Sequence, residues 1–146
     1  MGYNYGAGEI SGVRSIYKTT LVMCAGIMLL GTVICLTASR PLMALFTENE
    51  ETIQAGGLAL RIISAGFLLS SLSVTASGAL EGLGMGFASL IISLMRYAAV
   101  ILPAAWILCR LLGPEGVWHA FWITEAAAAA VSAAVWARAL RGLGGA

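Results

Sequence analysis

Long stretches without a charged residue constrain this chain more than any other feature of its sequence. Residues 19–38 are twenty uncharged residues in a row, and residues 62–80 are nineteen more. At 1.5 Å per residue, an α-helix of this length reaches about 28 to 30 Å, which matches the ~30 Å hydrocarbon core of a bilayer. We therefore expect each of these stretches to form a membrane-spanning helix.

The composition supports a membrane chain with an all-α fold. Hydrophobic residues make up 60% of the 146 residues and charged residues only 10%, against about 25% charged residues in soluble domains. Further apolar stretches follow the first two, and short polar segments separate them, so the chain has room for four spans and little else. The expected organisation is a cytoplasmic or interfacial lead-in (1–18), a membrane domain (19–140) with spans at about 19–38, 60–81, 87–109 and 117–137, and a cytoplasmic tail (141–146).

Several function classes are excluded by what the sequence lacks. A formal net charge of +1 and scattered basic residues do not suit a nucleic-acid-binding surface. The three cysteines lie inside apolar stretches, which favours neither a disulfide framework nor a metal site. No phosphate loop, nucleophile with a paired histidine or two-carboxylate site is present, so we predict no enzymatic activity, no catalytic residue and no cofactor.

Helix-breaking and helix-starting residues set the expected ends of the first two spans. Pro41 should end the first span, because proline lacks the backbone N–H that a continuing helix needs. Residues 9–18 mix basic and apolar residues, which favours either a short helix along the membrane surface or a plain polar lead-in. Residues 47–50 match a capping box that opens a helix. A helix from there to residue 80 would exceed the bilayer thickness, so we expect a bend at Gly56–Gly57.

Two ionisable residues are expected deep in the membrane. Arg96 lies nine residues into the third span, about 14 Å from its start, where a charge costs at least ~2.5 to 3.5 kcal/mol. Glu125 lies eight residues into the fourth span. Because a tight turn joins these two spans, they should lie side by side, and we hypothesise an Arg96–Glu125 pair. Pro103 should kink the third span.

Small and hydroxyl residues are concentrated in the second span. Ser70, Ser71 and Ser73 suit contact with protein or a wet cavity better than contact with lipid, so they join Arg96 and Glu125 as candidates for a substrate or ion pathway. Glycines recur at every fourth position near the end of this span, a pattern that lets helices approach closely. The predicted helix-packing residues are Gly78, Gly82, Gly86 and Pro103.

The distribution of basic residues predicts the orientation. Four basic residues fall on one side of the predicted spans and two on the other, which places both termini in the cytoplasm of a multi-pass protein of the cell membrane. The four are Arg14, Lys18, Arg138 and Arg141, and the two are Arg40 and Arg110.

A set of short motifs resembles one transporter family. The motifs are residues 2–8 before the first span, 41–47 after it, 77–84 at the end of the second, Leu102–Pro103, and residues 116–118. In order and spacing they are similar to the last third of a multidrug and toxic compound extrusion (MATE) transporter. This resemblance implies a twelve-helix, two-lobe antiporter that exports organic cations or drugs in exchange for H⁺ or Na⁺, of which this chain would supply the last four helices.

Two departures from the family pattern limit what the resemblance implies. Glu81 stands where members often have arginine, and Ser70 or Ser71 replaces the acidic residue that some members carry midway along the same helix. Sodium binding through this helix is therefore not predicted. Because alternating access requires two lobes, we expect the chain to be a partial transporter that is inactive alone. Its expected partners are the bilayer, the missing helices or a second chain, and small cationic or amphipathic substrates.

Two other functions fit parts of the pattern. A small four-helix exporter that works as a dimer has the right length, but exporters of that type carry an essential glutamate in the first span, and residues 19–38 contain no acid. A non-transporting membrane scaffold or assembly subunit would need only the alanine and glycine faces. Loss of cation efflux on mutating Ser71, Arg96 and Glu125 would separate transport from scaffolding.

Overall fold

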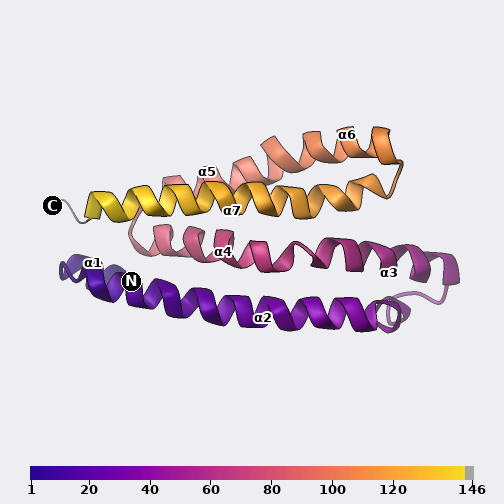
Figure 1. Ribbon diagram of the computed structural model, residues 1–146, viewed down its shortest axis with the longest axis horizontal. Coiled ribbons are helices and arrows are strands. Elements are labelled where there is room, and N and C mark those ends of the chain that lie inside the picture. Colours follow the sequence, from indigo (N-terminus) through magenta and orange to yellow (C-terminus); the bar gives the residue numbers. More distant parts are fainter. Residues whose placement is uncertain (144–146) are drawn as a thin grey trace.

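The protein is a bundle of long helices. The computed structural model describes residues 1–143, and every regular element in that range is helical. The elements are α1 (Gly2–Gly6), α2 (Ile10–Ala44), α3 (Glu50–Ser64), α4 (Phe67–Gly82), α5 (Gly86–Leu94), the π-helix η1 (Met95–Ile101), α6 (Leu102–Leu112) and α7 (Gly116–Leu143). Figure 1 shows rods that lie side by side and alternate in direction, with the N-terminus and the end of α7 at the same end. The all-α prediction is confirmed, and residues 144–146 of the predicted tail lie outside the described residues.

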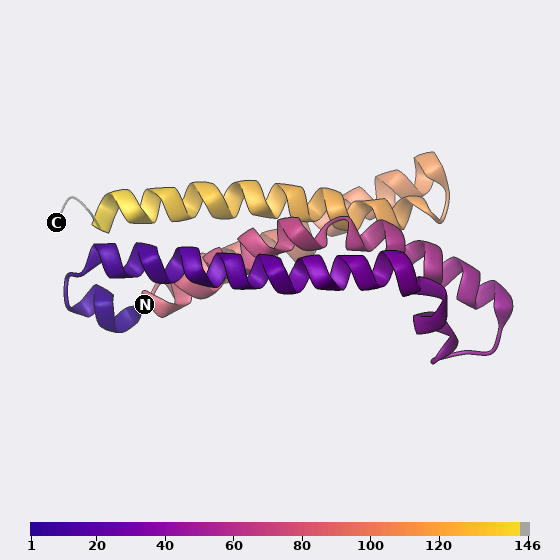
Figure 2. The ribbon, with the colours of Figure 1, turned by 60° about the horizontal axis from the view of Figure 1, so that its bottom comes forward.

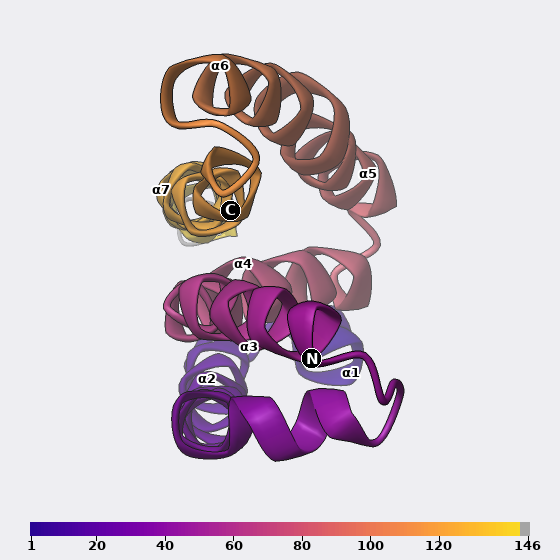
Figure 3. The ribbon, with the colours of Figure 1, turned by 90° about the vertical axis from the view of Figure 1, so that its right-hand side faces the viewer.

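The rods are stacked in an order that differs from their order along the chain. α2 packs against α3 and α4, which pack in turn against α7, and α7 also packs against η1 and α6. Figure 3 shows this order along the bundle axis, with α2 and α6 outermost. Large apolar side chains on both outer helices are mostly exposed, among them Met23 and Ile27 on α2 and Trp106 on α6. These outer faces suit lipid or further protein rather than water.

Three helical stretches are long and apolar enough to cross a membrane. They are Ile10–Ala44, Gly86–Leu112 and Gly116–Gly142. Helices α3 and α4 meet the same test together, although they are bent by 55° where they join. The structure therefore has three to four apolar helices of membrane-spanning length. The stretch Gly86–Leu112 lies beside Gly116–Gly142, as the tight turn between them predicted.

The bend between α3 and α4 is not where the sequence predicted it. It falls at residues 65–66 and not at Gly56–Gly57, which are helical. At Gly66 a Cβ atom would lie only 3.0 Å from the Cα of Trp122, so α7 presses against the backbone at this point. Gly56 instead makes room for the side chain of Met43, to which an added Cβ would be 2.4 Å away. The bend thus coincides with a close contact with α7, which the local sequence does not reveal.

The start of α2 differs from the prediction, whereas its straight part ends at the residue where the predicted first span ends. The helix runs without a break from Ile10, so residues 10–18 are not a separate surface helix. Its regular geometry is lost at Ala38 (φ −118°, ψ 22°), three residues before Pro41, because the proline ring would clash with a carbonyl one turn earlier. The remaining turns run across the end of the bundle (Figure 2). Asn49, not the predicted capping-box threonine, caps α3 by accepting a hydrogen bond from the Thr52 N–H at 3.0 Å.

Pro103 affects the third span in a different way from a simple kink. It lies in the first turn of α6, directly after the π-helix η1. Proline removes one backbone donor and crowds the preceding turn, and a wider turn relieves both problems. The stretch Gly86–Leu112 therefore continues as one span, with its irregularity spread over the turns that carry Arg96.

Candidate functional site

Three serines of α4 are buried, and each donates its hydroxyl to a backbone carbonyl three or four residues earlier in the chain. Ser70, Ser71 and Ser73 are 7%, 4% and 1% exposed. Their Oγ atoms donate to the carbonyls of Gly66 at 3.2 Å, Leu68 at 2.6 Å and Ser70 at 3.1 Å, respectively. A hydroxyl that donates in this way keeps its lone pairs free to accept. These serines can therefore accept a hydrogen bond from a ligand while their own donors stay satisfied.

Arg96 and Glu125 form an ion pair between η1 and α7, as hypothesised from the sequence. Their side chains are 18% and 13% exposed, so the pair is largely shielded within the bundle. The guanidinium carbon of Arg96 also lies 5.5 Å from the ring centre of Tyr97. The second carboxylate oxygen of Glu125, Oε2, is buried and has no hydrogen-bond partner among the described residues. The pair thus retains one strong acceptor for an incoming N–H or O–H group.

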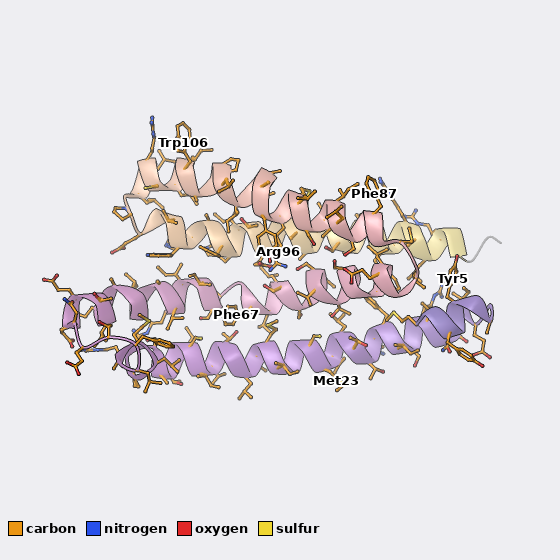
Figure 4. The ribbon with its side chains drawn as sticks, turned by 180° about the vertical axis from the view of Figure 1, so that it is seen from behind. Tyr5, Met23, Phe67, Phe87, Arg96 and Trp106 are labelled. Atoms are coloured by element: carbon orange, nitrogen blue, oxygen red, sulfur yellow. The ribbon has the colours of Figure 1, made fainter. Side chains whose placement is uncertain are left out.

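Two pockets meet at Arg96. One, of about 280 Å³, contains the polar groups Ser73, Ser77, Glu81, Ser93 and Arg96 in its wall. The other, of about 360 Å³, is more apolar and is lined by Met28, Ile63, Phe67, Ser70, Val74, Arg96, Phe121 and Glu125. Figure 4 shows Arg96 between α4 and α7, near the middle of the bundle. Ser71 lines neither pocket, so the structure brings four of the five predicted pathway residues to these pockets but not this one.

A third polar group at the site was not recognised as one from the sequence. Ser89 on α5 is 2% exposed, donates to the Oε1 of Glu81 at 2.6 Å and contacts the hydroxyl of Ser77. Ser77 and Glu81 are four residues apart on α4, so they share a helix face. The four-residue spacing of Ser77 and Glu81 could have been recognised in the sequence. Ser89 joins them only because the turn at Gly84 (φ +78°) folds α5 back along α4.

Together these groups form a line of polar side chains through an apolar bundle, which we call the polar seam. It consists of Ser70, Ser73, Ser77 and Glu81 on α4, Ser89 on α5, Arg96 on η1 and Glu125 on α7. Charged and hydroxyl groups at membrane depth are costly and typically face a pathway or other protein. The seam is therefore the candidate functional site of this chain.

The predicted helix-packing glycines have few neighbours in this structure. A Cβ added to Gly78 or Gly86 would meet nothing within 4 Å. Gly82 lies close to α1, since its carbonyl oxygen would be 2.7 Å from a Cβ on Gly2. A packing role for Gly78 and Gly86 thus remains a prediction that concerns contacts outside the described residues.

Comparisons with known proteins point to one family. Residues 1–107 match the sequence model of the MatE family. The chain is 32% identical over 125 residues to the probable multidrug resistance protein NorM of Deinococcus radiodurans, covering 81% of this chain and 28% of that protein. It is 22% identical over 125 residues to the multidrug export protein MepA of Staphylococcus aureus, covering 86% of this chain and 27% of that protein.

Solved structures have the same fold. An inward-facing multidrug resistance MATE family transporter superposes with a TM-score of 0.92 at 23% identity, over 97% of this chain and 33% of the other. The Vibrio cholerae MATE transporter VcmN in its bent form gives a TM-score of 0.88 at 24% identity, over 96% and 32% of the two chains. The chain thus spans about a third of these structures, and 28% of its Deinococcus relative.

Proposed function

Since the chain belongs to the MATE family of multidrug efflux transporters, we propose that it forms the last four membrane spans of an antiporter. The complete antiporter would have twelve helices in two lobes and export organic cations or drugs in exchange for H⁺ or Na⁺. The observation that carries this proposal is the polar seam, with its shielded Arg96–Glu125 pair. An apolar bundle that served only as an anchor would gain nothing from such costly groups.

The seam would act as part of the route for substrate or coupling ion. In the seam, the carboxylate oxygen Oε2 of Glu125 has no hydrogen-bond partner among the described residues. The hydroxyls of Ser70 and Ser73 on α4 can still accept a hydrogen bond. A cationic substrate or a proton would complete these hydrogen bonds. Aromatic side chains Phe67 and Phe121 line the neighbouring pocket and offer π faces to an amphipathic cation.

The proposed topology has four spans with both termini in the cytoplasm. If the bent pair α3 and α4 counts as one span, the number of spans is even. An even number places both ends of the chain on the same side of the membrane, in agreement with their position at one end of the bundle in Figure 1. The excess of basic residues at the end that holds the termini favours a cytoplasmic position for that end. In this topology residues 1–18 lead into the membrane domain, and the predicted spans 19–38, 60–81, 87–109 and 117–137 lie within longer helical stretches.

The chain alone is proposed to be inactive. Alternating access requires two lobes that move around a site between them, and this chain matches about a third of the structures it resembles. Proteoliposomes that contain only this chain should therefore show no ethidium uptake when a H⁺ or Na⁺ gradient is imposed. Gradient-driven uptake by the isolated chain would contradict this proposal.

A chimera tests the role of the seam. Residues 1–143 would replace the matching segment of the Deinococcus relative, and ethidium transport would be measured in proteoliposomes. We expect Glu125→Gln to reduce transport at least about tenfold, because it removes the charge that Arg96 or a cationic substrate needs. Glu115→Gln, outside both pockets at the turn before α7, is the matched control and should transport normally. Equal transport by both variants would favour the scaffold function.

A further inference from the structure

At the end of the bundle where the N-terminus lies, a pocket of about 640 Å³ opens beside the last turns of α7. Its walls are mostly apolar, with a basic and a phenolic side chain added. It is lined by Tyr5, Met85, Val135, Arg138, Ala139 and Gly142. Figure 4 shows Tyr5 on α1 near the end of α7. The pocket shares no residue with the two pockets of the polar seam, although Met85 adjoins the seam and accepts a hydrogen bond from the backbone N–H of Ser89 at 3.3 Å.

The level of this pocket relative to the membrane follows from a nearby aromatic pair. The rings of Tyr17 and Trp136 are stacked with centres 4.2 Å apart, between α2 and α7. Tyrosine and tryptophan are enriched at the level of lipid headgroups. Arg138 is two residues beyond Trp136, or about 3 Å further along the helix. Although Trp136 is itself buried against α2, this level leads us to expect the guanidinium of Arg138 near the phosphates of a leaflet.

Charge at the two ends of the bundle differs in sign. At the pocket end, which holds the start of α2 and the ends of α4 and α7, four basic residues (Arg14, Lys18, Arg138 and Arg141) outnumber Glu9 and Glu81. At the opposite end, which holds the end of α2, helix α3, the end of α6 and the turn before α7, three basic residues (Arg40, Arg61 and Arg110) are outnumbered by Glu48, Glu50, Glu51 and Glu115. No carboxylate among residues 1–143 forms an ion pair with Arg138. An anion is thus favoured at the pocket end, and Arg138 is available to bind it.

We propose that this pocket binds the headgroup and upper acyl chain of an anionic glycerophospholipid. Arg138 donates paired N–H groups to the phosphate and Tyr5 donates its hydroxyl, while Val135, Ala139 and Met85 contact the acyl chain. The combination of a cationic rim and an apolar wall fits a lipid better than a free anion, because a free anion has no apolar surface to bury against the wall. The proposal concerns lipid binding and does not depend on transport.

Native mass spectrometry of the delipidated chain in detergent tests the site. Dioleoylphosphatidylglycerol and dioleoylphosphatidylcholine are added in equal amounts, and one retained phosphatidylglycerol is expected. Arg138→Gln should weaken its retention by at least about fivefold, and Tyr5→Phe by less. The matched control is Arg14→Gln, which removes one charge at the same end but does not line the pocket, and which should weaken retention less than about twofold.

Three outcomes would overturn the proposal. Equal weakening by the Arg138 and Arg14 variants would mean that only diffuse charge attracts the lipid. Equal retention of the two lipids would mean that the headgroup charge is not recognised. Displacement of phosphatidylglycerol by millimolar inorganic phosphate would assign the pocket to a free anion, because a bound lipid is also held by its acyl contacts.

Discussion

Burying the Arg96–Glu125 pair costs hydration energy for both charges, and this cost is offset only while both partners are present. Each charge loses hydration when it is placed inside the bundle, and the attraction between them compensates for that loss. Removing one partner leaves the other without compensation, whereas replacing both with apolar residues removes the cost altogether. At the residue scale, stability therefore depends on whether the pair is kept or removed as a unit.

We expect Glu125→Leu to lower the free energy of unfolding by up to about 3 kcal/mol. The double variant Arg96→Met/Glu125→Leu should recover most of this loss, because it buries no lone charge. Unfolding would be followed by circular dichroism in mixed micelles as a denaturing detergent is added. A double variant no more stable than Glu125→Leu would show that the two charges do not compensate each other.

The pair between Arg40 and Glu50 provides an internal comparison. Its side chains are 58% and 60% exposed, so water already hydrates both charges. Breaking it by Glu50→Leu should cost less than about 1 kcal/mol in the same assay. A loss as large as that of Glu125→Leu would mean that burial is not the cause of the difference.

At the scale of elements, the bend between α3 and α4 lies at the point where α7 packs most closely against it. Gly66 allows the backbone of the bend to approach Trp122, and a larger residue would push the helices apart. The same contact brings Glu125 beside α4, since a Cβ on Gly66 would lie 3.2 Å from the Cγ of Glu125. The bend and the ion pair are thus parts of one packing arrangement.

Two glycine-to-alanine changes separate packing from helix propensity. Gly66→Ala should lower the melting temperature in detergent, because the new methyl group meets the backbone of Trp122 at 3.0 Å. Gly78→Ala has open space around it and should be neutral, or more stable by up to about 1 kcal/mol. A Gly66→Ala protein that melts at or above the unmodified temperature would contradict the proposed contact.

How far the sequence predicts this structure depends on the range of the interaction. Uncharged stretches revealed the long helices, and two deep charges joined by a short turn revealed their pairing, because both patterns are local or nearly so. The bend at Gly66 and the Ser89–Glu81 hydrogen bond depend on which helix packs against which. Asn49 rather than Thr47 caps α3 because the start of the helix is shifted by two residues, which a four-residue pattern does not specify.

At the scale of the whole molecule, the exposed apolar faces of α2 and α6 and the opposite charges of the two ends suggest one orientation in the membrane. The pocket end carries more basic side chains than the opposite end. Lys and Arg are retained on the cytoplasmic side during insertion, whereas Asp and Glu have little influence. Both the N-terminus and the end of α7 should therefore face the cytoplasm.

Cysteine labelling in whole cells tests this orientation. In a background where Cys24, Cys35 and Cys109 are replaced by alanine, Glu48→Cys places a thiol in the segment between α2 and α3, and Glu9→Cys places one between α1 and α2. A membrane-impermeant maleimide should label the position 48 variant in intact cells and the position 9 variant only after permeabilisation. The reverse pattern would invert the topology, and it would then move the proposed lipid site to the outer leaflet. Labelling of both variants in intact cells would show that the chain inserts in two orientations, as a small excess of basic residues at one end can allow.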